Sequence, residues 1–342
     1  MRVLVIGGTG FIGAPVARVL HDSGHEVAVF HRGLTDAELP PVVQRIVGDR
    51  GQFADSLPQL LAFAPHSVVD MTPMGAQDAH ATLSMVAQLD ATAIRLVAVS
   101  SMDVYLTYGR LIGTEPGPLL DPLLSEDSPL RDVHFPYRGQ GRDLDHYEKI
   151  LVERAVMSDP SIDGVVLRLP MVYGPWDRQH RILDDLRRMD DDRPAILLPD
   201  SLADWRVARA YVDDCAHAIA LAATHPAASG RIYHVAEADA LSQEEWVEAI
   251  AAAAGWSGEI VRVPDSELPE AWRVPIDTRH SWQADSARVR SELGYRELVG
   301  REQGLRRTVS HERAHPAANL PPLDYRLEDE LLARLRSGET QP

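Results

Sequence analysis

The stretch that decides the fold is Val3-Leu4-Val5-Ile6-Gly7-Gly8-Thr9-Gly10-Phe11-Ile12-Gly13. A short apolar run, typical of a buried strand, leads into spaced glycines, and a helical pattern follows over residues 13–23. Gly7 allows the tight turn, Gly10 lets the backbone approach a phosphate, and Gly13 permits close packing of helix on strand. The helix N-terminus adds N–H donors and a positive dipole. We predict a dinucleotide site formed by Gly7, Thr9, Gly10, Phe11, Ile12 and Gly13; an ordinary glycine turn is the alternative.

The end of the second predicted strand selects the kind of dinucleotide. The chain continues there as His31-Arg32-Gly33, without the carboxylate that would accept hydrogen bonds from a ribose 2′-hydroxyl. A guanidinium at Arg32 suits a 2′-phosphate, so we predict NADP, with NAD less favoured, and assign His31 to the same site. Stacking on adenine, or plain solvation, is the alternative for Arg32. Asp49 and Arg50, which close the third strand, are predicted to approach the adenine, with a solvated turn as the alternative.

Short β-branched runs alternate with helical patterns through the first half of the chain, which is typical of βαβ units. We predict strands at 3–6, 26–30, 44–47, 67–71, 94–99 and 165–169, and helices at 13–23, 52–63, 76–90 and 142–158. The predicted fold class is α/β: a Rossmann-type doubly wound parallel sheet with a smaller, mixed α/β C-terminal domain that binds substrate. Residues 109–141 are predicted to form a long loop over the carboxyl edge of the sheet.

The second half has a looser pattern. It predicts helices at 180–189, 212–224, 242–254 and 327–336 and strands at 195–198 and 231–235, with Ser242 and Glu245 spaced as a capping box. The dinucleotide domain is expected to cover residues 1–175, with 206–236 returning to it. The substrate-binding domain is expected to cover 176–205 and 237–336, and 337–342 are expected to be a disordered tail.

The composition restricts the partners. The 342 residues carry 51 acidic and 34 basic side chains, a formal charge of −17, which disfavours nucleic acid and anionic lipid. Cys215 lacks a second cysteine for a disulfide or a thiolate metal site, and we expect it buried on a helix. Asp190-Asp191-Asp192 is interpreted as a solvated turn rather than a metal site. No signal peptide or membrane-spanning stretch is recognised, so a cytoplasmic location is expected.

Segments beyond the glycine turn resemble motifs of the extended short-chain dehydrogenase/reductase family, the NAD-dependent epimerase/dehydratase group. They are Val99–Tyr105 (VSSMDVY), Leu167–Pro175 (LRLPMVYGP), Arg209–Asp214 (RAYVDD), and Asp285–Arg288 (DSAR) followed by Leu293–Tyr295 (LGY). The resemblance covers nearly the whole chain and implies a nicotinamide cofactor near Ser100, Lys149 and Pro170. It also implies a small-molecule substrate near Tyr105, Tyr173, Trp176 and Arg206, and a homodimer formed through the helices at 76–90 and 142–158.

The family's catalytic set is a Ser or Thr, a Tyr and a Lys, the last two spaced Y-x-x-x-K on one helical face, so that the ammonium lowers the phenol's pKa and holds the nicotinamide ribose. Ser101 matches the Ser, and Lys149 matches the Lys because Glu153 follows it by four residues, as is common in the family. The tyrosine position then holds Asp145. Tyr147 would point about 200° away from Lys149 on a regular helix, so the usual Tyr is predicted to be missing, as in the atypical branch of the family.

Other groups are candidates for the acid/base role. Asp145 would share the Lys149 face and be held ionised, which suits a base. His146 titrates in the right range, and a loop could bring in Tyr137 or Tyr105. We rank Lys149 first, Asp145 second and Ser101 third, with a hydroxyl that satisfies backbone at a strand end as the alternative for Ser101.

Two functions fit these observations. The first is an NADP- or NAD-dependent oxidoreductase, epimerase or dehydratase acting on a hydroxyl or carbonyl carbon of a small polar substrate, such as a nucleotide sugar or a secondary metabolite. The alternative is a non-catalytic NADP-binding sensor or scaffold protein, in which Asp145 is a surface residue. An RNA-associated role, known among atypical relatives, is weakened by the acidic balance of the chain.

Overall fold

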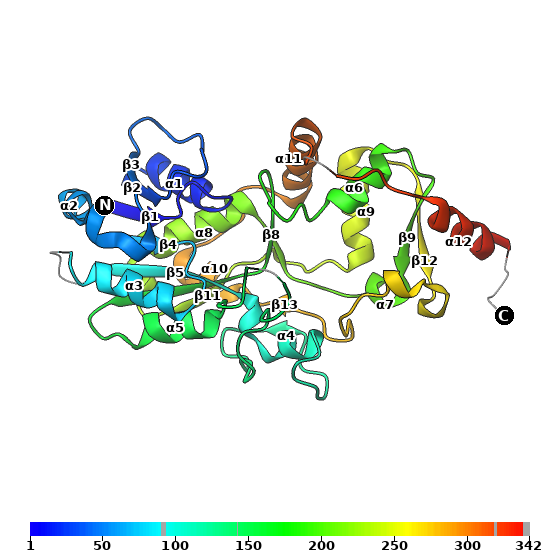
Figure 1. Cartoon of the computed structure of the whole chain (residues 1–342), viewed down its shortest axis with the longest axis horizontal. Coiled ribbons are helices and arrows are strands. Elements are labelled where there is room, and N and C mark those ends of the chain that lie inside the picture. The colour runs from blue at the N-terminus through cyan, green and yellow to red at the C-terminus, as the bar shows by residue number, and fades with distance from the viewer. Residues whose placement is uncertain (90–93, 142, 318–319, 338–342) are drawn as a thin grey trace.

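The computed structural model describes residues 1–89, 94–141, 143–317 and 320–337, and it is an elongated molecule with two lobes (Figure 1). The first lobe is built on a parallel sheet with the strand order β11-β7-β5-β4-β1-β2-β3. Its strands are β1 (Arg2–Ile6), β2 (Glu26–His31), β3 (Gln44–Val47), β4 (Ser67–Asp70), β5 (Arg95–Ser101), β7 (Asp163–Leu169) and β11 (Ile232–His234). β1 is an inner strand, paired with β4 on one side and β2 on the other, so the glycine turn lies within the carboxyl edge of the sheet.

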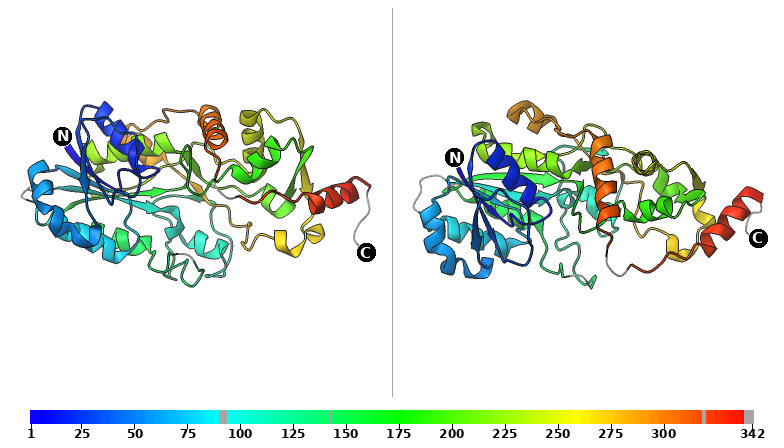
Figure 2. Two further views of the ribbon diagram at one scale, coloured as in Figure 1. Left: turned by 45° about the horizontal axis from the view of Figure 1, so that its top comes forward. Right: turned by 90° about the horizontal axis from the view of Figure 1, so that it is seen from above.

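Helices cover both faces of this sheet, which confirms the predicted doubly wound α/β fold (Figures 1 and 2). On one face lie α1 (Gly13–Asp22) and α8 (Val212–Thr224), and on the other lie α2 (Phe53–Phe63), α3 (Ala76–Val86) and α5 (Lys149–Ser158). Alternate residues of β1 belong to two different apolar cores: Val3 and Val5 pack on the α1 side, and Leu4 and Ile6 on the α2 side. Burial on both faces explains why the strands are almost continuously apolar.

The second lobe is smaller and mixed, with a parallel strand pair and several helices (Figure 2). It contains β9 (Ala195–Pro199), β12 (Glu259–Val263), α6 (Leu183–Asp190), α7 (Asp200–Ala203), α9 (Gln243–Ala254) and α12 (Arg326–Ser337). A short parallel pair, β8 (Met171–Tyr173) and β10 (Arg209–Tyr211), lies between the lobes together with α11 (Arg301–Ala314). The remaining elements are α4 (Leu106–Leu111), α10 (Ala287–Leu293) and the paired strands β6 (Leu123–Leu124) and β13 (Gln283–Ala284).

Many predicted elements are found within a residue or two, and the capping box of Ser242 and Glu245 on α9 is confirmed. Cys215 is buried on α8, as expected. The predicted helix at 142–158 is wrong at its start, because α5 begins at Lys149. The elements that were not predicted are the strands β6, β8, β10, β12 and β13 and the helices α4, α7, α10 and α11. The predicted helix at 76–90 ends at Val86, and its last residue and most of the expected tail lie outside the described residues. The division into two domains stays a proposal.

A buried ion pair ties the ends of the β3 and β4 strands together. Arg50 donates from its two terminal nitrogens to the two oxygens of Asp70, at 2.6 and 2.7 Å. Only 2% of the Asp70 side chain and 15% of the Arg50 side chain are exposed. Thr72 and Thr82 accept further hydrogen bonds from the same guanidinium. Arg50 is therefore an internal brace, and its contact with the adenine stays a prediction.

We predict that Asp70→Ala lowers the free energy of unfolding by about 3–5 kcal/mol, because it leaves a buried guanidinium without its countercharge. Urea unfolding followed by circular dichroism measures this loss. The matched control is Glu302→Ala, which breaks an ion pair to Arg306 whose side chains are 76% and 59% exposed. That control should cost no more than about 0.5 kcal/mol. Equal effects of the two substitutions would contradict the bracing role.

Candidate functional site

The glycine turn between β1 and α1 has the geometry that a diphosphate requires. Gly7 has a φ of +79°, which side-chain-bearing residues rarely adopt. A Cβ on Gly13 would lie 2.2 Å from the Gly7 carbonyl oxygen, so only glycine lets α1 approach the strand this closely. The Gly10 N–H closes the turn on Gly7 O at 3.1 Å, and Ile12 leads into α1 with no side-chain cap. This backbone fits a bound pyrophosphate, as the sequence predicts.

The loop after β2 lies beside this turn. Thr9 Oγ1 and Thr35 Oγ1 are hydrogen-bonded at 2.8 Å, and Arg32 is exposed. Burial, and after it the charge of Arg45, lowers the pKa of His31. The Arg45 guanidinium on β3 is therefore close to the end of β2, where it is paired with Asp36 at 3.2 Å. Nothing in the chain order links β3 to Arg32, so the sequence does not predict this position. Asp49 is exposed and accepts a hydrogen bond from Gly51 N, so its contact with adenine stays a prediction.

Lys149 is the single lysine of the chain, and it is buried at the first turn of α5. Its Nζ donates to two backbone carbonyls, Pro73 O at 2.7 Å and Val99 O at 2.9 Å. These carbonyls belong to the loop after β4 and to β5, so the amine is fixed at the carboxyl edge of the sheet. Burial lowers the pKa of Lys149 to about 8, against the attraction of Asp103 and Asp70.

Tyr147 lies next to Lys149, and the prediction that it faces elsewhere is wrong. The Lys149 Nζ is 5.5 Å from the centre of the Tyr147 ring, and Ser101 is close enough to lower the pKa of the Tyr147 phenol. Its hydroxyl donates to Asp103 Oδ2 at 2.7 Å. The prediction failed because it assumed a regular helix before Lys149, whereas the backbone there is not helical and the two residues can present their side chains to the same place.

The assumption of a regular helix before Lys149 was also the basis for proposing Asp145 as the base, and that basis is lost. With α5 starting at Lys149, Asp145 shares no helical face with the lysine; it is exposed, and its Oδ1 accepts from Gly139 N at 2.9 Å. His146 is likewise exposed.

Ser100 and Ser101 follow one another on a strand and so point to opposite faces. The Ser100 hydroxyl donates inward to Glu153 at 2.5 Å, which contradicts its assignment to the cofactor, whereas Ser101 is on the side of Tyr147.

The predicted substrate contacts do not converge on one place. Tyr105 is fully buried, with its hydroxyl bound to Arg168 and His234, and we correct its assignment to substrate. Tyr173 is also buried, and it donates to Glu237 at 2.7 Å, so the same correction applies. Arg206 forms an ion pair with Glu245, with 2.9 Å between a guanidinium nitrogen and a carboxylate oxygen. These groups have internal partners that a linear sequence does not reveal.

Trp176 remains open to a ligand. Its side chain is 65% exposed and its φ is +69°. Its ring contacts His311 of α11 and His315, the residue after that helix, at 4.4 and 4.9 Å between ring centres. A shallow hollow of about 490 Å³ adjoins these histidines and includes Pro175 and Arg307. Pro170, between β7 and β8, is partly exposed, and its contact with the cofactor stays a prediction.

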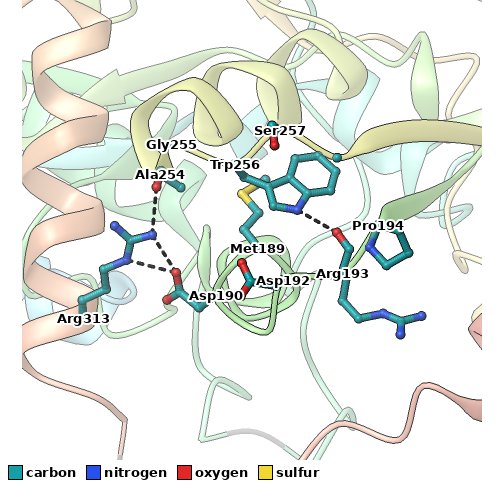
Figure 3. Close-up of a pocket in the computed structure, with 11 residues that line it drawn as sticks. Met189, Asp190, Asp192, Arg193, Pro194, Ala254, Gly255, Trp256, Ser257 and Arg313 are labelled. Atoms are coloured by element: carbon teal, nitrogen blue, oxygen red, sulfur yellow. Dashed lines mark hydrogen bonds and ion pairs between the residues drawn. The ribbon is translucent and has the colours of Figure 1, made fainter.

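A separate hollow of about 510 Å³ lies in the second lobe, between the ends of α6 and α9 (Figure 3). Arg313 reaches across it to Asp190 at 2.6 Å and to the Ala254 carbonyl at 3.0 Å. None of the predicted cofactor or catalytic residues lines it.

Within the described ranges, no group of three His, Cys, Asp or Glu side chains is placed to hold a metal ion, and no helix is long and apolar enough to cross a membrane.

The fold and the glycine turn define a Rossmann-type dinucleotide-binding enzyme. The sequence profile of the NAD dependent epimerase/dehydratase family matches residues 3–236, and the chain belongs to this family. It is an enzyme of the oxidoreductase, epimerase and dehydratase type.

Relatives and solved structures agree with this membership. The 2′-dehydrokanamycin reductase of Streptomyces kanamyceticus is 30% identical over 77% of this chain and 70% of its own length. The 2-alkyl-3-oxoalkanoate reductase of Stenotrophomonas maltophilia is 28% identical over 75% of this chain and 76% of its own length. The structure of UDP-glucuronic acid 4-epimerase from Bacillus cereus, in complex with UDP-glucuronic acid and NAD, superposes with a TM-score of 0.67. That match covers 92% of this chain and 99% of the epimerase at 17% identity, which shows the shared fold.

We predict that Lys149 titrates near pH 8 in the folded protein rather than near its ordinary value of 10.5. Protein labelled with ¹³C-lysine carries one labelled side chain, whose Cε shift follows deprotonation by NMR. The unfolded chain binds this proton more tightly than the folded one, so Lys149 should add stability as the pH rises from about 8 toward 10.5. A titration midpoint at the ordinary value would contradict the buried, carbonyl-bound position of the amine.

Proposed function

We propose that this chain is an NADP-dependent reductase that converts a ketone of a small polar substrate into a secondary alcohol. The observation that carries the proposal is the meeting of Ser101, Tyr147 and Lys149 at the carboxyl edge of the sheet. These are the three side-chain types of the family's catalytic set, with the tyrosine two residues before the lysine instead of four. Two curated relatives are named as reductases of ketones, which supports the direction of the reaction.

Each of the three side chains has a distinct task in such a reaction. A reduced nicotinamide held along the glycine turn would supply hydride to the carbonyl carbon. Ser101 would orient the carbonyl oxygen, and Tyr147 would give that oxygen a proton. Lys149, fixed by Pro73 O and Val99 O, would hold the nicotinamide ribose and contribute positive charge beside the phenol. Together they would stabilise the negative charge that develops on the carbonyl oxygen.

The protonation state of Tyr147 favours reduction over oxidation. Burial, followed by the charge of Asp103 and the hydrogen bond to it, raises the pKa of Tyr147 well above 10. The phenol is therefore neutral near pH 7 and starts the reaction as a proton donor. A reductase needs a donor at the carbonyl oxygen, whereas a dehydrogenase needs a base that is already ionised.

We also propose that the cofactor is NADP. The end of β2 has Arg32 and no carboxylate, and Arg45 is close enough to influence His31. Two guanidinium groups beside the adenosine end would suit a 2′-phosphate. The Bacillus cereus epimerase was solved with NAD, so the choice between the two cofactors calls for a direct measurement. Pairing of two subunits through α3 and α5 stays a prediction.

We expect Tyr147→Phe to lower the rate of ketone reduction by about 100-fold or more, because it removes the proton donor and keeps the ring. NADPH affinity, measured by fluorescence titration, should not change. The assay follows loss of NADPH absorbance with a panel of ketones that includes an oxidised aminosugar and a 3-oxoalkanoate. Tyr325→Phe is the matched control, since that hydroxyl also donates to a carboxylate, Asp191, but lies in the other lobe.

Full activity of Tyr147→Phe would refute the proposed role. Binding of NADPH without turnover of any ketone in the panel would support the sensor or scaffold alternative instead. Product that forms without net consumption of NADPH would indicate epimerisation or dehydration, in which the hydride returns to the substrate.

We expect Arg32→Ala to weaken NADPH binding about 10- to 100-fold, since charge-assisted hydrogen bonds contribute about 1.5–3 kcal/mol. NADH binding should be nearly unchanged, because NADH lacks the 2′-phosphate. Isothermal titration calorimetry measures both affinities, with Arg336→Ala on α12 of the second lobe as the control. Equal losses for NADPH and NADH would contradict the assignment of Arg32 to the 2′-phosphate.

A further inference from the structure

Asp103 carries a buried carboxyl group next to the candidate site, and this group has no role in the reaction proposed above. It follows Ser101 in a short 3-10 turn at the end of β5, and it is 2% exposed. Its Oδ2 accepts hydrogen bonds from Tyr147 at 2.7 Å and from Tyr137 at 3.1 Å. Its Oδ1 is buried and has no hydrogen-bond partner among the described residues. A buried carboxyl left partly unsatisfied is costly, which points to a functional reason for keeping it.

The hydrogen-bonded chain continues beyond Asp103. The hydroxyl of Tyr108, on α4, donates to the Tyr137 hydroxyl at 2.8 Å, and the Tyr137 hydroxyl donates to Asp103. The rings of Tyr108, Tyr137 and Tyr147 also contact one another edge to face, at 6.2 and 5.1 Å between centres. Tyr108 and Tyr137 are half-buried, whereas Asp103 is enclosed. An unbroken line of exchangeable protons therefore runs from the partly exposed tyrosines to Tyr147.

The charged groups that act on Asp103 come from two segments. Lys149 faces it from α5, and the buried Arg131 faces it from the long loop, where Arg131 also binds Glu148 at 3.2 Å. Burial raises the pKa of Asp103, and the bonds and charges of Tyr147, Arg131, Lys149 and Tyr137 offset part of that rise. Asp103 can therefore exchange a proton at a pH higher than an ordinary aspartate can.

We propose that Tyr108, Tyr137 and Asp103 form a proton relay that reprotonates Tyr147 during reduction. This inference rests on the proposed function, because it assigns the source of the proton that Tyr147 gives to the substrate. The usual position of the tyrosine in the family, four residues before the lysine, is taken here by an exposed aspartate. The relay would be particular to chains that carry the phenol at position 147 and a carboxyl at position 103.

With the relay, every proton and electron pair of the reduction is accounted for. When hydride and its electron pair reach the carbonyl carbon, the C=O π bond breaks and its electrons move to the oxygen. That oxygen takes the phenolic proton of Tyr147. The Tyr147 oxygen then takes a proton that passes through the Asp103 carboxylate from the Tyr137 hydroxyl, and Tyr137 regains its proton through Tyr108 from solvent. The sum is ketone, NADPH and one proton giving secondary alcohol and NADP⁺.

Tyr137→Phe is the main test, because it breaks the relay and keeps the ring contacts. We expect kcat to fall about tenfold or more, the low end of what a positioned proton transfer contributes, and the solvent deuterium isotope effect on kcat to increase. KM and NADPH affinity should stay unchanged. The matched control is Tyr233→Phe, which removes a hydroxyl bound to Glu292 and leaves the relay intact. Parental kcat and isotope effect in Tyr137→Phe would overturn the relay.

A second measurement does not depend on turnover or on correct folding of a charge-deleting variant. Infrared titration of the cofactor-free protein should show a carboxyl C=O band that persists above the ordinary aspartate pKa of 3.8 and is absent from Asp103→Asn. No band assignable to position 103 above that pH would overturn the relay. Loss of activity in Tyr147→Phe together with normal kinetics in Tyr137→Phe would reject the relay alone, whereas an active Tyr147→Phe would reject the proposed function itself.

Discussion

The buried carboxylate of Glu148 sets the position where α5 begins, and the geometry of the site depends on it. One oxygen accepts from Ile150 N at 3.1 Å as the helix cap and from Arg131 at 3.2 Å, and the other accepts from Phe135 N at 2.6 Å. A negative charge at a helix N-terminus is favourable. Because the cap fixes Lys149 as the first helical residue, Glu148 is extended, and the chain before the helix can direct Tyr147 toward the lysine. The same carboxylate ties the long loop, and Tyr137 with it, to the sheet.

Buried ion pairs give the carboxyl edge of the sheet its rigidity. Arg50 and Asp70 join the ends of β3 and β4, while Arg168 and Glu153 join β7 to α5 with a distance of 2.7 Å. Glu153 also receives the Ser100 hydroxyl, so the strand that carries Ser101 is held from its opposite face. Arg50 and Ser100, which the sequence motifs assigned to the cofactor, thus form internal contacts that support the site. Rigid support of this kind keeps reacting groups in position.

In the proposed mechanism, the chain supplies the side-chain types of the family's catalytic set with a different spacing. A phenol, a hydroxyl and an ammonium come together in space although the Y-x-x-x-K pattern is broken, because helix register is one of several ways to bring two side chains together. The acidic chain has one lysine, and that lysine lies at the centre of the site. The buried positive charge of the site comes from this one lysine, and all other positively charged side chains of the Lys and Arg type are arginines.

The sequence by itself determined the parallel sheet, the helices α1 and α8, and the glycine turn, because apolar periodicity and glycine requirements are local properties. It also selected Lys149 and Ser101 as candidates, and their catalytic roles stay predictions. Tertiary structure alone decided the partners of Tyr147, Asp103 and Arg45, and it moved Arg50, Ser100, Tyr105 and Tyr173 into the interior. The physical reason is that these assignments depend on which segments meet across the sheet edge. A buried polar side chain is satisfied by whichever group lies nearest in space, and sequence order does not specify that group.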